Sequence, residues 1–226
     1  MILSDSSIKA ARARGEIVIT PWDLDALGPN SYDVHLGPEV LVQRRYLANG
    51  YGGHDLRPLD AAVEFPLLNQ DYVPIPPEGL VLSPAWLYLA STLEYTESNA
   101  YVPVLDGKSS VGRLGVRIHA TAGRGDVGFK GHWTMEIDVV QPVRLYAGMP
   151  IGQLIFHLVH GEIENRYDKR PTSKYGGTTN SRPQASKMFK NFPLPLRCQV
   201  CGAVVREGLV VCSGLSPCLS TYTARR

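Results

Sequence analysis

Residues 107–113, Gly-Lys-Ser-Ser-Val-Gly-Arg, combine small side chains, two hydroxyls and two cations. A phosphate chain needs this combination, because it binds donors that approach closely and groups that carry positive charge. The spacing differs from that of a Walker A loop, which places its lysine after a second glycine. On these residues alone, an ordinary turn explains the segment as well as a phosphate site does.

A second glycine-rich turn follows at residues 121–131 and contains Asp126 and Phe129. A carboxylate can accept a hydrogen bond from a sugar hydroxyl or orient a water, and an aromatic ring can pack on a sugar or a base. A β-turn with a capping aspartate explains these residues about equally well.

Residues 133–139 alternate between apolar and polar side chains, and Glu136 belongs to the polar set. This alternation predicts a strand that turns Glu136 away from the hydrophobic core, toward solvent or a cleft. A positioned carboxylate can act as a general acid and base, which is typically worth about 10²–10⁴-fold in rate. By itself, a glutamate on the polar face of a strand is more often a solvated surface residue.

The elements that must position these residues are mostly short strands. The segment from Ser4 to Arg14 is predicted to be the only regular helix, capped by Ser4 or Asp5 and stopped by Gly15. The remaining apolar or alternating runs predict many strands separated by glycine and proline, as in an all-β sandwich or barrel. No helix long enough for a crossover is visible, which argues against a Rossmann-like sheet. The predicted strands are residues 16–20, 32–36, 39–43, 79–83, 86–90, 116–121, 133–140, 143–146 and 151–159.

Composition narrows the class of protein. The 226 residues carry a net charge of +2, which is too small for a general nucleic-acid-coating protein. The first residues lack the apolar stretch of a signal peptide, and no run approaches the length of a membrane span. We therefore expect a cytoplasmic protein that binds neither nucleic acid nor membrane.

The residue composition changes at two points along the chain. From about residue 162 it becomes basic and rich in glycine, which predicts a flexible closing arm of the main domain at 1–192. Residues 193–226 hold all the cysteines, Cys198, Cys201, Cys212 and Cys218. Four thiolates can bind a structural zinc, but the irregular spacing is also compatible with a disordered extension.

The central stretch resembles the dCTP deaminase family, relatives of the dUTPases, through Gly107–Arg113, Thr121–Gly131 and the Met135-Glu-Ile137 pattern. Further similarity lies in Met1–Asp5, Gly28–Gly37, Ala147–Leu154 and Ser181–Phe192. The resemblance implies a dUTPase-like distorted β-barrel or jelly roll that forms a homotrimer with active sites between subunits. It also implies that dCTP is deaminated to dUTP and ammonia, in the supply of dUMP for thymidylate synthesis. Mg²⁺ would bind through the substrate phosphates, without a catalytic zinc.

Site residues carry over from the family by position. The resemblance makes Glu136 the proton shuttle, with the backbone at Ala122 positioning water and amine. The residues implied to hold the phosphates are Lys108, Ser109, Ser110, Arg113, Tyr167 and Lys174. Those implied to hold the nucleoside are Thr121, Arg124, Asp126 and Phe129. The pair Arg124-Gly125 departs from the family, in which this position carries an apolar pair or Arg-Ile.

Three alternatives stay open, and a rival zinc site must also be weighed. A bifunctional enzyme that continues to dUMP and diphosphate is favoured by the small Gly123. A plain dUTPase is disfavoured by Glu136, because dUTPases lack a glutamate on this strand. A non-catalytic nucleotide-binding regulator is compatible with the pair Arg124-Gly125. The residues His160, Glu162, Cys198 and Cys201 partly match the motif of zinc deaminases. Arg197 counts against this interpretation, because that motif has proline at this position.

Overall fold

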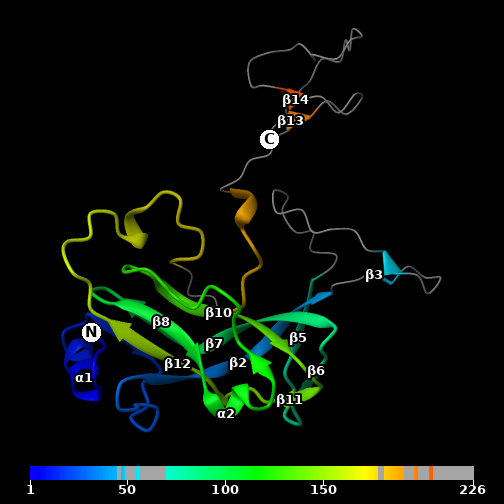
Figure 1. Ribbon diagram of the computed structural model, residues 1–226, viewed down its shortest axis with the longest axis horizontal. Coiled ribbons are helices and arrows are strands. Elements are labelled where there is room, and N and C mark those ends of the chain that lie inside the picture. Colours follow the sequence, from blue (N-terminus) through cyan, green and yellow to red (C-terminus); the bar gives the residue numbers. More distant parts are fainter. Residues whose placement is uncertain are drawn as a thin grey trace. The chain divides into compact units, whose positions relative to one another are not determined.

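The computed structural model describes residues 1–44, 47–48, 54–55, 70–177, 181–190, 196–197 and 204–205. Contacts divide the chain into two compact units (Figure 1). The first comprises Met1–Leu59 and Phe65–Ala185, and the second comprises Asp60–Glu64 and Ser186–Arg226. All the candidate site residues described below belong to the first unit.

The chain begins with the predicted helix, α1 (Asp5–Ala13). Ser4 caps it by accepting a hydrogen bond from the Ser7 N–H, and Ile8 and Ala11 are buried. Gly15 ends it with a positive φ of 72°, which an L side chain rarely adopts. The prediction for this helix is confirmed.

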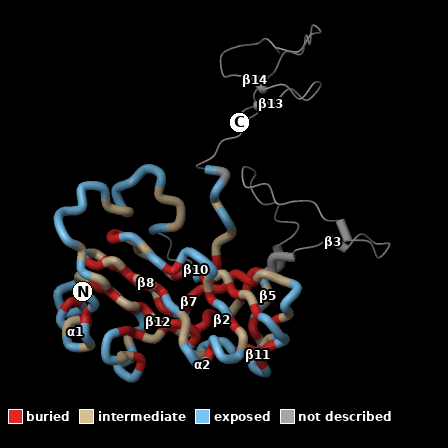
Figure 2. Tube along the Cα trace, viewed as in Figure 1, coloured by how far each residue is buried: buried red, intermediate tan, exposed pale blue. Residues whose placement is uncertain are grey.

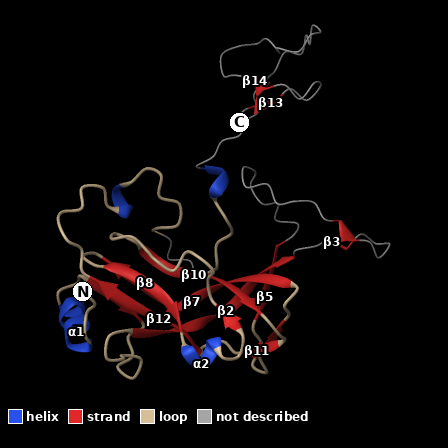
Figure 3. Ribbon diagram, viewed as in Figure 1, coloured by secondary structure: helices blue, strands red, loops and turns tan. Residues whose placement is uncertain are grey.

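Antiparallel strands form most of the regular structure described in the first unit (Figure 3). The main sheet is nearly closed and barrel-like, with the order β8-β12-β2-β7-β10-β9, while β1 pairs with β7 and β5 with β2. The all-β prediction is therefore confirmed. The strands of this sheet are β1 (Ile17–Thr20), β2 (Tyr32–Arg44), β5 (Gln70–Pro74), β7 (Trp86–Ser98), β8 (Val102–Gly107), β9 (Val116–Arg117), β10 (Lys130–Val139) and β12 (Pro150–His157).

The structure also describes three two-stranded sheets and three short helices. Two-stranded sheets pair β6 (Leu80–Leu82) with β11 (Val143–Leu145), β3 (Leu47–Ala48) with β4 (His54–Asp55), and β13 (Leu196–Arg197) with β14 (Val204–Val205). The short helices are α2 (Ser109–Gly112), η2 (Tyr167–Lys169) and η3 (Met188–Lys190).

Strand β10 shows how the core fixes the orientation of the site. Trp133, Met135, Ile137 and Val139 are buried, while the alternate residues face the other way and are only partly covered (Figure 2). The predicted face of Glu136 is thus confirmed.

Some strands differ from the prediction. Residues 116–121 form a strand only at Val116–Arg117. Residues 32–36 and 39–43 are parts of one strand, β2, whose pairing with β7 shifts register between Leu36 and Val40. Strands β5 and β8 were not predicted, and neither was the second half of β7, residues 91–98.

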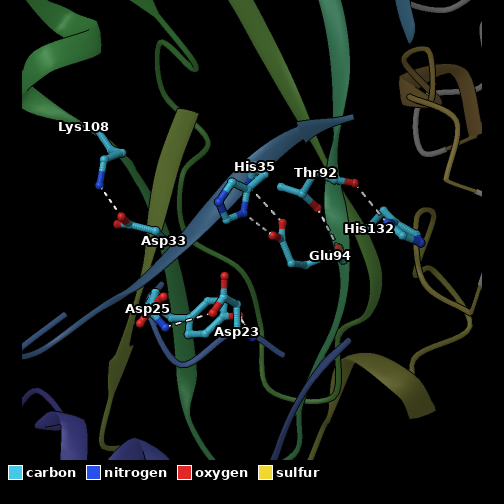
Figure 4. Close-up of polar contacts among 9 residues, drawn as sticks. Asp23, Asp25, Asp33, His35, Thr92, Glu94, Lys108 and His132 are labelled. Atoms are coloured by element: carbon cyan, nitrogen blue, oxygen red, sulfur yellow. Dashed lines mark hydrogen bonds and ion pairs between the residues drawn. The ribbon is translucent and has the colours of Figure 1, made fainter. Parts of the chain in front are cut away.

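The second half of β7 buries several polar side chains, and most of them have partners inside the sheet, although the Ser91 hydroxyl has none among the described residues. The Glu94 carboxylate is 2% exposed and accepts hydrogen bonds from the His35 backbone N–H at 2.9 Å. It also contacts His35 Nδ1 at 2.5 Å (Figure 4). The Thr92 hydroxyl donates to the Glu94 carbonyl at 2.9 Å. Such pairing removes most of the cost of burying polar groups.

Candidate active site

Strand β8 lies beside one glycine-rich turn and leads into the other. Residues 123–125 run beside it, since Leu105 N–H donates to the Gly123 carbonyl at 2.7 Å and Gly125 N–H donates to the Pro103 carbonyl at 2.8 Å. At its far end, Gly107 leads into α2. The order of the sheet therefore fixes where each turn lies relative to β8.

The predicted phosphate residues cluster at α2. Ser109, Ser110 and Arg113 are exposed, and the first N–H groups of any helical turn lack intrahelical acceptors. Lys108 is half-buried and its ammonium forms an ion pair with Asp33 of β2. Hydroxyls, N–H groups and cations are thus presented together on one short turn.

The predicted nucleoside turn leaves Thr121, Ala122, Arg124 and Asp126 exposed. Phe129 is half-buried and lies between Trp133 and Tyr167, with ring centroids 5.0 and 6.0 Å away. The Arg170 guanidinium lies 3.9 Å from the Asp126 carboxylate.

The departure at Arg124-Gly125 has a structural reason. A Cβ placed on Gly125 would lie 2.5 Å from Cη2 of Trp133 and 3.2 Å from Pro103. The indole therefore occupies the space that a side chain at position 125 would need. Trp133 is itself held by a hydrogen bond from its Nε1–H to the Thr96 hydroxyl at 3.0 Å.

Thr134, Glu136 and Asp138 are successive polar residues on the outward face of β10. The Thr134 hydroxyl accepts a hydrogen bond from the Gln184 N–H at 3.1 Å. Asp138 binds Arg117 through both carboxylate oxygens, at 2.9 and 2.6 Å. Glu136 lies between them, half-buried, and its carboxylate has no hydrogen-bond or ion-pair partner among the described residues. Of these two carboxylates, only that of Asp138 is engaged by another residue in the part of the chain that the structure describes.

Segments on both sides of Glu136 are held close to the strand. The Glu136 N–H donates to the Ile118 carbonyl at 2.9 Å, which places the residues leading to Thr121 and Ala122 alongside β10. The Tyr72 hydroxyl donates to the Pro183 carbonyl at 3.2 Å, and Arg182 pairs with Glu39 at 2.8 Å. The segment 182–184 is thus anchored near Thr134.

The arm after β12 packs on the nucleoside turn. Tyr167 N–H donates to the Val127 carbonyl at 3.0 Å, and the Tyr167 hydroxyl accepts from Tyr175 N–H at 2.9 Å. Lys174 lies 5.8 Å from the Tyr175 ring centroid. Hydrogen bonds from the Arg166 guanidinium hold the pKa of Asp168 below its usual value.

Within one chain, the predicted phosphate-binding residues do not all lie together. Tyr167 lies with residues 127–129, near the start of β8, whereas α2 follows the end of β8 (Figure 1). The six residues of β8 separate these two groups by about 17–20 Å at the usual rise per residue. Lys108 and Arg113 therefore lie far from Tyr167 and Lys174 within a single chain.

Sequence reasoning missed three groups near these turns: Asp33, His119 and Arg166. Asp33 lies in the Gly28–Gly37 segment that was noted only for its family resemblance. His119 packs beside Gly123, and its buried Nδ1 has no hydrogen-bond partner in the described part of the chain. Arg166 donates to the Asn99 carbonyl at 2.7 Å.

The rival zinc site receives no geometric support from its described members. His160 and Glu162 are exposed in the loop after β12, and the four cysteines lie outside the described residues. Where the structure describes the chain, no group of three or more metal-ligating side chains occurs. In the same residues, no helix is long and apolar enough to cross a membrane.

Comparison with known proteins identifies the family. Residues 2–159 match the model of the family described as dCTP deaminase-like. The chain is 44% identical over 192 residues to a "dCTP deaminase, dUMP-forming" of Clostridium acetobutylicum, covering 85% of this chain and 99% of the relative. It is 43% identical over the same length to a protein of the same name from Cytophaga hutchinsonii, again covering 85% of this chain and 99% of the relative.

A solved structure agrees in fold. The 2′-deoxycytidine 5′-triphosphate deaminase from Agrobacterium tumefaciens superposes with a TM-score of 0.53 at 21% identity, over 70% of this chain and 48% of that one. This chain thus spans about half the length of that structure. The chain belongs to the dCTP deaminase-like family.

Proposed function

We propose that this protein is a hydrolytic dCTP deaminase of the dUMP-forming kind. The balanced reaction is dCTP + 2 H₂O → dUMP + NH₃ + diphosphate. Water replaces the amine at C4 of cytosine, and a second water cleaves the bond between the α- and β-phosphates. The support comes from family membership, from the names of the relatives and from the state of Glu136.

The observation that carries the proposal is that the Glu136 carboxylate has no hydrogen-bond or ion-pair partner among the described residues. Deamination requires a water to lose a proton, the ring nitrogen N3 to gain one, and the amine to gain one as it leaves. Glu136 can move these protons because it projects from strand β10 and, within the residues that the structure describes, pairs with no cation, unlike Asp138 two residues away. The backbone at Ala122, in the segment that follows Ile118, would position the water and the amine.

The dUMP-forming alternative is preferred to release of dUTP for two reasons. The most similar relatives reported above carry that name. In addition, a Cβ on Gly123 would lie 2.5 Å from the Leu105 carbonyl oxygen and 2.7 Å from the His119 ring, so position 123 admits only glycine here. A small residue at this position is the feature that resembles the bifunctional members.

The phosphates would bind at α2, and the nucleoside would bind at residues 121–129. The donors at α2 are cations, hydroxyls and N–H groups, so they suit phosphate oxygens and offer little to a metal. Mg²⁺ would therefore bind the triphosphate itself and neutralise part of its charge. No step is assigned to a zinc ion.

A second copy of the chain would complete each site. Tyr167 and Lys174 are separated from α2 by the length of β8, so one nucleotide can contact both groups only if they come from different subunits. This separation supports the homotrimer with active sites between subunits. The cytoplasmic location stays a prediction from the sequence.

Glu136→Gln tests the proposal. The amide keeps the size of the side chain but cannot transfer the protons, so turnover of dCTP should fall by about 10²–10⁴-fold. Binding of dCTP, measured by calorimetry, should change little. Asp138→Asn is the matched control on the same face of β10 and should retain most of the turnover. Substantial turnover by Glu136→Gln would refute the assignment of the proton shuttle.

A further inference from the structure

Asp33 lies opposite the phosphate turn in a row that crosses three strands. Gln153 of β12 is paired in register with Asp33 of β2 on one side and with Asp106 of β8 on the other. Directly opposed residues in antiparallel strands share a face of the sheet. Asp33 and the end of β8 are therefore on the same face, although 75 residues separate Asp33 from Lys108.

Lys108 reaches back across β12 to Asp33. Its ammonium contacts the Asp33 carboxylate (Figure 4), and the two side chains are 28% and 26% exposed. Gln153, on the middle strand β12, forms hydrogen bonds toward both β8 and the residue before β2. Its amide nitrogen donates to the Gly107 carbonyl at 3.4 Å, while its amide oxygen accepts from the Ser31 hydroxyl at 3.0 Å.

We propose that Asp33 is a positioning residue that orders Lys108 for the substrate phosphates. This inference rests on the proposed function, because it assigns the ligand of Lys108 as the triphosphate of dCTP. An ammonium has three donors, so Lys108 can hold Asp33 and still donate to phosphate oxygens. Asp33 acts through Lys108 and does not touch the substrate.

Two opposing effects decide whether Asp33 strengthens or weakens the binding of dCTP. Asp33 brings a negative charge toward an anionic ligand, but water screens this repulsion because the pair is about a quarter exposed. Without Asp33, the long lysine side chain would be free in the empty site and would have to be ordered when the nucleotide binds. Ordering outweighs screened repulsion, so removing Asp33 weakens binding.

A double-mutant cycle tests the inference. We expect Asp33→Ala to raise the Kd of dCTP roughly five- to twentyfold and its KM similarly, with kcat nearly unchanged. Asp33→Asn should fall between wild type and Asp33→Ala, since its amide oxygen still accepts from the ammonium. In a Lys108→Ala background, Asp33→Ala should have no further effect on the Kd.

Calorimetry of the full chain measures these constants without requiring turnover. Binding of deoxycytidine should be the same in all variants, because it lacks phosphates. Glu16→Gln is the control, since it removes an ion pair of 2.7 Å with Arg14 that does not involve α2. It should leave the Kd of dCTP unchanged.

The outcomes separate the inference from the proposed function. Tighter binding of dCTP by Asp33→Ala, or an equal loss in the Lys108→Ala background, overturns the role of Asp33. Wild-type protein that binds dCTP without converting it refutes the proposed function, but the cycle still decides the role of Asp33. Wild-type protein that does not bind dCTP refutes both.

Discussion

Gly125→Ala tests the close packing that makes the nucleoside turn of this protein differ from that of its family. The added methyl group would lie 2.5 Å from Cη2 of Trp133. The backbone at position 125 lies outside the positive-φ region, so alanine introduces a steric clash and no backbone strain. Trp133 cannot simply turn aside, because it is 7% exposed and its indole N–H is bonded to Thr96.

The expected cost follows from overpacking a filled core, which is typically about 1–3 kcal/mol. For a chain of this size, each kcal/mol corresponds to about 2–4 °C in Tm, so Tm should fall by about 2–12 °C. The KM for dCTP should also rise, since Phe129 packs on Trp133 with ring centroids 5.0 Å apart. Gly112→Ala is the control for the Tm measurement, because nothing lies within 4 Å of its added methyl. It is not a control for KM, because Gly112 belongs to α2.

A thermal unfolding series with Trp133→Phe completes this test. The smaller ring removes the atoms that clash, so part of the loss caused by Gly125→Ala should be recovered in the double variant. The coupling free energy should lie within about 0.5–3 kcal/mol. An unchanged Tm for Gly125→Ala, or strictly additive effects in the double variant, would refute the argument that the indole fills this space.

Three further predictions follow from the site and the tail. Arg113→Ala should weaken binding of dCTP by about 1.5–3 kcal/mol and leave binding of deoxycytidine unchanged, whereas equal losses for both ligands would show that Arg113 does not contact phosphate. Truncation after Phe192 should give a folded, active trimer, because the relatives cover only 85% of this chain, and a monomeric or insoluble product would show that the tail is structural. Dialysis against a zinc-selective chelator followed by Mg²⁺, or Cys198→Ser with Cys201→Ser, should leave dCTP turnover intact. Loss of activity in both experiments, with zinc restoring it after chelation, would establish a zinc deaminase.

The sequence predicted the elements whose patterns are local. The alternation around Glu136 correctly gave both strand β10 and the face of its carboxylate, and Ser4 and Gly15 marked the ends of α1. Such features depend on neighbouring residues along the chain, so they are visible without tertiary structure.

The rest depends on contacts between distant residues. The segment Ser91–Ser98 is too polar to suggest a strand with buried residues, and His35 and neighbouring elements satisfy most of the polar groups that it buries. The fit of Gly125 against Trp133 and the pairing of Asp33 with Lys108 likewise appear only after the strands pack. No local pattern indicates either contact.

The most direct test of the whole account is the product formed from dCTP. Purified protein should be incubated with dCTP and Mg²⁺, and the nucleotides should be separated while ammonia and diphosphate are measured. The account predicts dUMP, ammonia and diphosphate in equal amounts, without accumulation of dUTP. Accumulation of dUTP would contradict the dUMP-forming assignment, and unchanged dCTP would contradict the deaminase itself.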